Sequence, residues 1–189
     1  MKKIALIPGW MNKSGMYCGK EELYEVLEVW KKMISPQNKI QTDWIIGHSL
    51  GCNYILFSWG KNKKLKLILV NPLLPKRSLA IWFSKWIKFK CEESKPRNKQ
   101  VISGIKEKCF GIKWCWRLLR KDFDKILNEI PKDRIKIICG EKDFFYCDEK
   151  FRKYVQSKGI EILEIKNVGH DWNKKFDKEI EKIINKDRE

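Results

Sequence analysis

The stretch that decides the fold reads Trp44-Ile45-Ile46-Gly47-His48-Ser49-Leu50-Gly51, and a helix-like segment, 52–58, follows it. A short apolar strand here runs into the pattern G-x-S-x-G, which is typical of a sharp turn that presents a serine hydroxyl above a sheet. The backbone N–H of Leu50, at the start of the helix, is placed to bind an oxyanion. An ordinary strand-turn-helix with Ser49 as the helix cap would read the same way, so the rest of the chain must decide.

Length and composition predict one α/β domain over residues 1–189 that stays in the cytoplasm. The chain is 43% hydrophobic and poor in Gly and Pro, which excludes a disordered protein. No apolar run is long enough to cross a bilayer, and the N-terminal run is broken by Pro8-Gly9 and lacks a cleavage site, so we expect neither membrane insertion nor a signal peptide. Seven scattered cysteines without a C-x-x-C pair indicate free thiols.

Strand and helix patterns alternate along the chain. Five short apolar runs predict strands over Lys3–Pro8, Trp44–Gly47, Leu65–Asn71, Arg134–Gly140 and Glu161–Asn167. Helical patterns lie between or after them, over Glu21–Met33, Cys52–Trp59, Phe144–Ser157 and Trp172–Asn185. This alternation predicts a parallel sheet of about five strands with flanking helices, and a functional site beyond the carboxyl ends of the strands.

Histidine chemistry with Ser49 leaves little choice, because the chain holds only two histidines, His48 and His170. A metal site rich in histidine is therefore excluded, and we expect no metal and no cofactor. His48 is adjacent to Ser49, and adjacent side chains in such a turn diverge. His170 lies in a glycine-containing loop before the last helix, which Asp171 is placed to cap, and it is the candidate base; a surface-loop histidine is the alternative.

Asp143 is the candidate acid, because it follows the strand that ends at Gly140 and can hold the tautomer of a histidine. The alternative is a helix cap for a segment that starts at Phe144. Glu141 and Asp148 are lesser candidates for the same role. The candidate residues then follow one another as serine, acid and histidine.

A second oxyanion donor is expected from the loop after the first strand, Pro8-Gly9-Trp10-Met11. Gly9 lets the backbone approach closely, so the N–H of Trp10 can act together with that of Leu50. The Trp10 ring would also form a wall of the acyl pocket.

In these motifs the chain resembles the α/β-hydrolase family, which has the same order of serine, acid and histidine. The matching pieces are Pro8-Gly9-Trp10, the 47–51 turn, Gly140-Glu141-Lys142-Asp143 and Gly169-His170. Within that family, the Gly-Trp pair and the Ser-Leu-Gly turn resemble the pimeloyl-acyl-carrier-protein methyl ester esterases of biotin synthesis. The resemblance implies a serine carboxylesterase that yields the free acid and methanol. It also places the oxyanion-binding amides of that group on Trp10 and Leu50.

The chain departs from larger hydrolases in its first half. Only about ten residues separate the first predicted helix from Trp44, too few for another strand and its crossover. We therefore expect that an outer strand is missing and that the first strand lies directly beside the Trp44–Gly47 strand.

Residues 72–131 form a predicted helical lid over the strand ends. Residues 73–128 hold 15 Lys and Arg against 5 Asp and Glu, a net charge of +10 in a chain of net charge +17. The segment Lys113–Leu127 reads as one amphipathic helix. Basic residues recur on one side of this helix, and the other side carries Trp116, Leu119, Phe123 and Leu127.

A basic lid suits an acidic partner, and we expect an acyl carrier protein to dock there. Arg117 and Arg120 can chelate the phosphate of its phosphopantetheine, and Lys113 and Lys121 extend the same surface. Nucleic acid is the rival partner, but no nucleic-acid motif is present and we expect none to bind. Two other hypotheses stay open for the protein, a carboxylesterase of another small or acyl ester and a basic binding protein on a hydrolase scaffold.

Membrane-surface contact is a further alternative for the lid. It would use the aromatic residues Trp82, Phe83, Trp86 and Phe89 together with Lys85 and Lys88. We instead expect these aromatic side chains to lie over the acyl channel.

Overall fold

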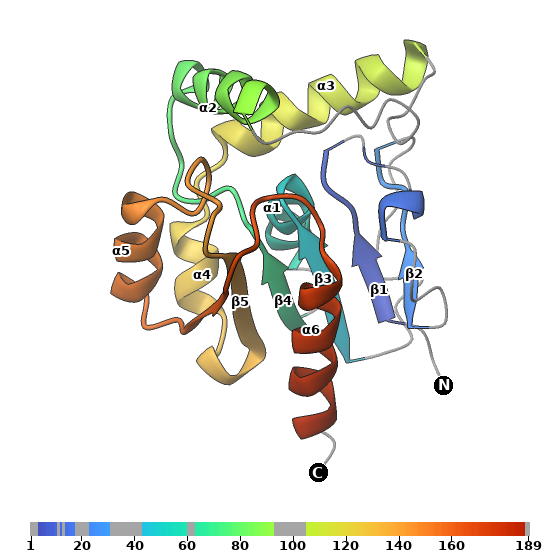
Figure 1. The fold of residues 1–189 in the computed structure, drawn as a ribbon, viewed down its shortest axis with the longest axis vertical. Coiled ribbons are helices and arrows are strands. Elements are labelled where there is room, and N and C mark those ends of the chain that lie inside the picture. The colour runs from blue at the N-terminus through green and yellow to red at the C-terminus, as the bar shows by residue number, and fades with distance from the viewer. Residues whose placement is uncertain are drawn as a thin grey trace.

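The computed structural model describes residues 4–10, 12, 14–17, 23–30, 43–59, 63–92 and 105–187. Within them, six parallel strands form one sheet in the order β2-β1-β3-β4-β5-β6 (Figure 1). The strands are β1 (Ile4–Ile7), β2 (Tyr24–Val26), β3 (Trp44–His48), β4 (Lys66–Val70), β5 (Ile135–Gly140) and β6 (Ile162–Ile165). β1 pairs directly with β3, which confirms the expected neighbour of the serine-bearing strand.

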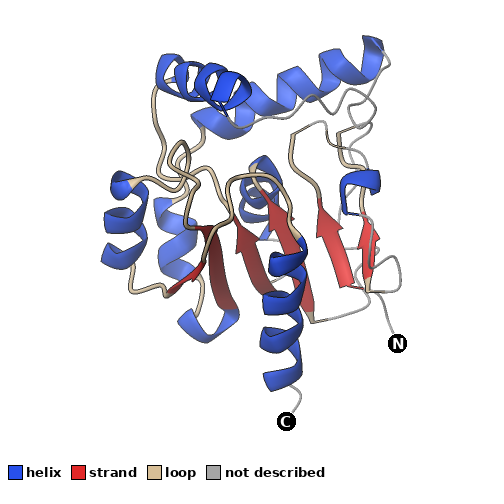
Figure 2. Cartoon of the chain, in the orientation of Figure 1, coloured by secondary structure: helices blue, strands red, loops and turns tan. Residues whose placement is uncertain are grey.

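Helices cover both faces of the sheet, so the central strands are apolar on each side (Figure 2). One face packs against α1 (Leu50–Trp59), α4 (Asp124–Glu129) and α5 (Glu149–Ser157). The other face packs against α6 (Lys174–Lys186), through Phe176, Ile180 and Ile184. Burial on both faces explains why these strands read as continuous apolar runs rather than alternating ones.

Among the described residues the sheet has six strands where about five were predicted, and the expectation that an outer strand is missing was wrong, because β2 lies beside β1. The predicted helix over Glu21–Met33 is also wrong where the structure describes it, since Tyr24–Val26 is this strand. Leu23, Leu27 and Trp30 are buried, and their spacing of four and three residues imitates a helical face. The connection from β2 to β3 therefore starts at residue 27 and not after the predicted helix. It is long enough for the crossover between two parallel strands.

The later helices begin after their predicted starts. Before α5, the Asp148 side chain accepts the N–H of Phe151, so the helix starts at Glu149 rather than at Phe144. The last helix starts at Lys174 and is capped by Asn173, not by Asp171. In both cases a side chain that can cap the helix sets its start.

Two helices lie above the carboxyl ends of the strands (Figure 1), and we call α2 (Leu79–Glu92) and α3 (Ile105–Arg120) the lid helices. The predicted single helix over Lys113–Leu127 is wrong, since α3 ends at Arg120 and α4 begins at Asp124. The break lets the chain descend beside β5. Of the apolar side chains of this segment, Trp116 is exposed, whereas Phe123 and Leu127 are buried.

Two short 3-10 helices complete the described elements, η1 (Ser14–Tyr17) and η3 (Lys132–Arg134). None of the described helices combines the length and the apolar character that crossing a bilayer requires.

Candidate active site

Ser49 lies between the end of β3 and the start of α1, in a left-handed backbone conformation with φ of 53°. Such a conformation is strained for a residue with a side chain, and the surroundings hold it. The N–H of Ser49 donates to the carbonyl of Val70. A Cβ on Gly47 would lie 2.8 Å from the backbone of Cys52, and one on Gly51 would lie 2.4 Å from the carbonyl oxygen of Ile7.

The three predicted triad residues come together above the sheet. His170 Nε2 lies 2.8 Å from Ser49 Oγ, and His170 Nδ1 lies 2.6 Å from Asp143 Oδ2. A carboxylate only accepts hydrogen bonds, so Nδ1 carries the proton and Nε2 accepts the Ser49 hydroxyl. This is the tautomer in which a histidine can take a proton from a serine.

Asp143 is the acid of this arrangement, and its neighbours hold other positions. Asp143 is fully buried, and its second oxygen accepts the N–H of Tyr146. Its alternative role as cap of a helix starting at Phe144 is excluded, because no helix starts there. Glu141 accepts the N–H of Asn167, and Asp148 caps α5.

Asn71, at the end of β4, fastens the loop that carries His170. Its side-chain amide donates to the carbonyls of Gly169 and His170, at 3.2 and 2.9 Å, while its oxygen accepts the N–H of Gly140. One side chain thus ties the loop after β5 to the loop after β6. The sequence placed Asn71 among the strand ends but did not indicate this role.

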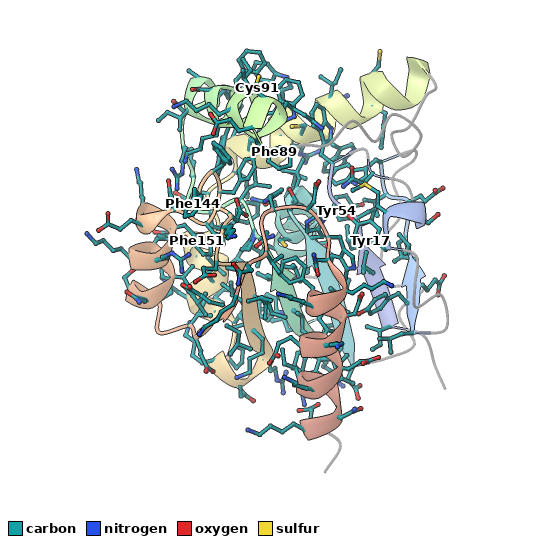
Figure 3. The ribbon with its side chains drawn as sticks, in the orientation of Figure 1. Tyr17, Tyr54, Phe89, Cys91, Phe144 and Phe151 are labelled. Carbon is teal, nitrogen blue, oxygen red and sulfur yellow. The ribbon has the colours of Figure 1, made fainter. Side chains whose placement is uncertain are left out.

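Aromatic rings enclose the imidazole of His170. Phe89 reaches from the underside of α2, and its ring centroid lies 5.2 Å from that of His170 (Figure 3). The Tyr146 ring lies at 4.3 Å. Sequence reasoning had placed Phe89 over the acyl channel, whereas it packs on the histidine.

Both predicted oxyanion donors lie beside Ser49. Trp10 and Leu50 line the same cavity as the serine. Within the described part of the chain, neither backbone N–H has a hydrogen-bond acceptor, which leaves both available to a ligand. The Trp10 indole N–H donates to the carbonyl of Gly111 in α3, at 3.0 Å, so the loop after β1 is attached to a lid helix.

A cavity of about 570 Å³ lies between Ser49 and the lid helices. Its walls carry no charged side chain. They are formed by Trp10, Ser49, Leu50, Leu73, Leu79, Ala80, Trp82, Phe83, Trp86, Ile112, Cys115, Trp116, Leu119 and Tyr146. Three of the four lid aromatics expected over an acyl channel, all except Phe89, are therefore in the wall. The volume lies within the range of small-molecule sites.

An ion-pair cluster attaches α2 to the body of the protein. Arg77, just before α2, is buried and donates twice to the Asp148 carboxylate, and Lys85 of α2 donates to the same group at 2.9 Å. Burial alone would raise the pKa of Asp148, but these hydrogen bonds lower the pKa well below its usual range. The carboxylate therefore stays charged and joins the lid to the cap of α5.

The predicted partner-binding residues Lys113, Arg117, Arg120 and Lys121 are all exposed and lie outside the cavity wall. Arg117 differs from the other three. Its guanidinium lies over the rings of Phe57 and Trp114, at 4.9 and 5.0 Å from their centroids, so it also packs against the protein.

The described cysteines are free thiols, and none is arranged as a nucleophile. Burial raises the pKa of the Cys52 and Cys147 thiols, and it raises the pKa of Cys115, in the cavity wall, to about 12. These groups are therefore protonated at neutral pH. Among the described residues, no three His, Cys, Asp or Glu side chains gather as a metal site would need.

Solved structures align with this chain over nearly its whole length. A thermophilic esterase from Thermogutta terrifontis aligns with a TM-score of 0.69 at 13% identity, over 98% of this chain and 90% of that one. The chain has the α/β-hydrolase fold. E-2-(Acetamidomethylene)succinate hydrolase aligns with a TM-score of 0.65 at 10% identity, over 97% and 91% of the two chains.

A monoacylglycerol lipase from Paleococcus ferrophilus aligns with a TM-score of 0.56 at 15% identity, over 96% of this chain and 93% of that one. No protein-family model and no curated protein sequence matches the chain. At these identities the likeness concerns the fold, so the activity has to be argued from the site itself.

His48 does not reach Ser49, as expected, and points to the opposite side of the turn. Its buried ring lies within hydrogen-bond distance of the Tyr17 hydroxyl, at 2.8 Å, and of the His170 carbonyl oxygen, at 2.9 Å. Burial, together with the nearby His170 ring, lowers the pKa of His48 to about 3. The imidazole is therefore neutral at physiological pH.

We expect the His48 ring to stay neutral, with its proton on Nε2, from pH 8 down to pH 5. The variant His170→Gln leaves His48 as the only histidine, so the ring ¹⁵N chemical shifts in an NMR titration report on it alone. The Nε2–H tautomer should persist throughout. A protonation midpoint near 6.5, as in an unfolded chain, would contradict the burial of this ring.

The same shift predicts how stability depends on pH. The unfolded state binds a proton on His48 below about pH 6.5, while the folded state does not until about pH 3. The free energy of unfolding should therefore fall as the pH drops through this window. Urea unfolding at pH 7.5 and pH 5 should show a smaller loss in His48→Gln than in the natural protein.

Proposed function

We propose that the protein is a serine hydrolase that cleaves carboxylic esters of apolar acyl groups. One observation carries the proposal. The Ser49 hydroxyl is hydrogen-bonded to His170, which is held by buried Asp143, at the floor of an apolar cavity that is partly open to solvent. A serine that merely capped α1 would need neither the histidine nor the cavity.

The chemistry follows from this geometry. Ser49 Oγ attacks the ester carbonyl while its proton moves to His170 Nε2, and Asp143 stabilises the resulting imidazolium. The N–H groups of Trp10 and Leu50 bind the oxyanion of the tetrahedral adduct. The adduct collapses as His170 gives its proton to the leaving alcohol, and water then releases the acid from the acyl-serine by the same steps.

The cavity wall selects the acyl group. Because no charged side chain lines the cavity, a carboxylate inside it would be buried without a partner, which is costly. An uncharged, apolar chain instead exchanges water for the aromatic and aliphatic wall. The preferred substrate class is therefore a neutral ester with an apolar acyl chain.

Within this class we propose the methyl ester of a pimeloyl group carried by acyl carrier protein in biotin synthesis, which would yield the free acid and methanol. The Gly9-Trp10 loop and the Ser49-Leu50-Gly51 turn support it through their resemblance to such esterases. The uncharged methyl-ester end also suits the cavity. A carboxylesterase of another small or acyl ester is the second candidate, because an apolar wall can accept many different acyl chains.

The exposed cations of the lid support an acidic carrier as partner. Lys113, Arg120 and Lys121 lie on or directly after α3, outside the cavity wall. A carrier docked there would present its acyl chain to the cavity beneath α3, while opposite charges would speed the encounter. Arg117 would contribute less, because its guanidinium already stacks on two rings.

Ser49→Ala should abolish hydrolysis of p-nitrophenyl butyrate, since it removes the attacking oxygen. Asp143→Asn should lower kcat by about 10⁴-fold, because the amide favours the wrong tautomer of His170. Glu141→Gln is the matched control, two residues earlier in the same turn after β5, and should keep its activity. If Ser49→Ala remained active, the protein would be a binding protein on a hydrolase scaffold or would use other groups.

Acyl-chain length should raise kcat/KM from acetate to hexanoate esters by up to about fourfold per methylene that enters the cavity. Dimethyl pimelate should be cleaved at least about 10-fold faster than monomethyl pimelate, whose free carboxylate is unpaired in the cavity. Cys115→Trp fills the wall and should shift the preference to short chains. Cys109→Trp, an exposed site on the same helix, should not; equal effects would exclude this cavity as the acyl site.

Reversing two lid charges, in Arg120→Glu with Lys121→Glu, should lower kcat/KM for methyl pimeloyl-acyl carrier protein by about 10-fold at low salt. The loss should shrink in 0.5 M salt, where charges are screened. Lys178→Glu with Lys186→Glu, on α6, is the control of equal charge. Equal losses of kcat/KM in both variants would mean that the net charge of the protein, and not docking at the lid, causes the effect. If this substrate is not hydrolysed at all, only the broader proposal of a carboxylesterase remains.

A further inference from the structure

The hydroxyl of Tyr17 lies at the centre of a buried hydrogen-bond chain behind the site. Tyr17 is the last residue of η1 and lies near β1 (Figure 3). Its oxygen is 2.7 Å from the backbone N of Gly9 and 2.8 Å from His48 Nδ1. Asn12 approaches the same oxygen at 3.5 Å. All of these groups lie within the loop after β1 or at the end of β3.

The direction of each bond follows from what its ends can do. His48 Nε2 faces the carbonyl oxygen of His170, at 2.9 Å, and a carbonyl only accepts. Nε2 therefore carries the proton of the neutral ring, and Nδ1 must accept. The Tyr17 hydroxyl donates to Nδ1, and its oxygen in turn accepts the N–H of Gly9.

The two ends of this hydrogen-bond chain lie at two groups that the proposed chemistry uses, the oxyanion donor and the base. Gly9 directly precedes Trp10, whose N–H is a proposed oxyanion donor. The carbonyl at the other end belongs to His170, the proposed base. The chain runs through His48, the residue before Ser49. It therefore fixes the oxyanion loop, the serine turn and the base loop relative to one another.

Packing leaves these side chains little freedom. The Tyr17 and His48 rings both meet the ring of Trp172 edge to face, with centroids 5.0 and 5.5 Å away. All three side chains are buried. A buried chain of this kind, with every donor and acceptor matched, favours a single arrangement of the backbone groups at its ends.

We propose that Tyr17 and His48 are positioning residues that hold the Trp10 oxyanion donor in register with His170. The inference rests on the proposed esterase function. Neither side chain touches the substrate, so each acts through the backbone of Gly9 or of His170. A shift of the oxyanion donor by even a fraction of its hydrogen-bond length weakens binding of the transition state more than binding of the substrate.

Tyr17→Phe removes only the hydroxyl and keeps the ring. It should lower kcat by about 10- to 100-fold with KM almost unchanged. Affinity for an alkyl boronic acid, which forms a tetrahedral adduct on Ser49, should fall by the same factor as kcat. Affinity for the product carboxylic acid should not change. Equal weakening of both ligands would mean that the cavity itself is damaged, and would overturn the proposal.

A double-mutant cycle tests whether the two residues act through one chain. His48→Phe breaks both of its hydrogen bonds and keeps a ring; if it does not fold, His48→Gln replaces it. Combined with Tyr17→Phe, it should lower kcat no further than the more severe single variant. If the two losses of kcat multiply, the two residues act independently and not through the hydrogen-bond chain.

Tyr24→Phe is the matched control. Tyr24 is a buried tyrosine whose ring also meets the Trp172 ring, with centroids 6.1 Å apart. It is not part of the hydrogen-bond chain through Tyr17 and His48. It should keep the kcat of the natural protein. A loss equal to that of Tyr17→Phe would assign the effect to packing around Trp172.

The outcomes separate this inference from the proposed function. Activity that survives Ser49→Ala rejects the serine mechanism, and the positioning role falls with it. If Ser49→Ala is inactive and Tyr17→Phe has the kcat of the natural protein, the esterase function stands and only the positioning role is rejected. The active fraction of each variant is measured by stoichiometric labelling of Ser49 with a fluorophosphonate, so that misfolded protein does not count as slow enzyme.

Discussion

The contact between the start of α1 and the end of β1 is the constraint on which the site depends. A Cβ at Gly51 would lie 2.4 Å from the carbonyl oxygen of Ile7, so only glycine lets the helix come so close. This approach places the start of α1, with the amide of Leu50, beside the loop that carries Trp10, while Ser49 turns the chain in its left-handed conformation. The geometry of the turn and the placement of the oxyanion-binding groups thus depend on one close contact between backbones.

The site was predictable from the sequence because each of its residues follows the carboxyl end of a strand. Ser49, Asp143 and His170 occur at such ends, and parallel strands bring those ends to one edge. The edge strand Tyr24–Val26 was missed because its buried neighbours repeat at helical spacing. The connection of Tyr17 to His48 was also missed, since 31 residues separate them and no local pattern encodes a contact of that kind.

Charge and cavity are separated in space. The lid segment is strongly basic, yet the residues that the lid helices contribute to the cavity wall carry no charge. Positions of opposite character alternate along α3, where exposed Arg120 follows Leu119 of the cavity wall. One pair of helices can therefore present cations to the solvent and hydrocarbon to the space over Ser49.

The lid helices also carry most of the exposed apolar surface. Of seven large, exposed hydrophobic side chains in the described residues, only Phe144 lies elsewhere; the others are Ile81, Phe83, Trp86, Ile87, Ile112 and Trp116. A patch of this kind favours contact between copies of the chain, whereas a net charge of +17 keeps the copies apart. Salt shortens the range of that repulsion to about 8 Å at physiological ionic strength and leaves the apolar attraction in place. The colloidal stability of this protein is therefore set by ionic strength, and concentrated salt should drive its molecules together through the lid.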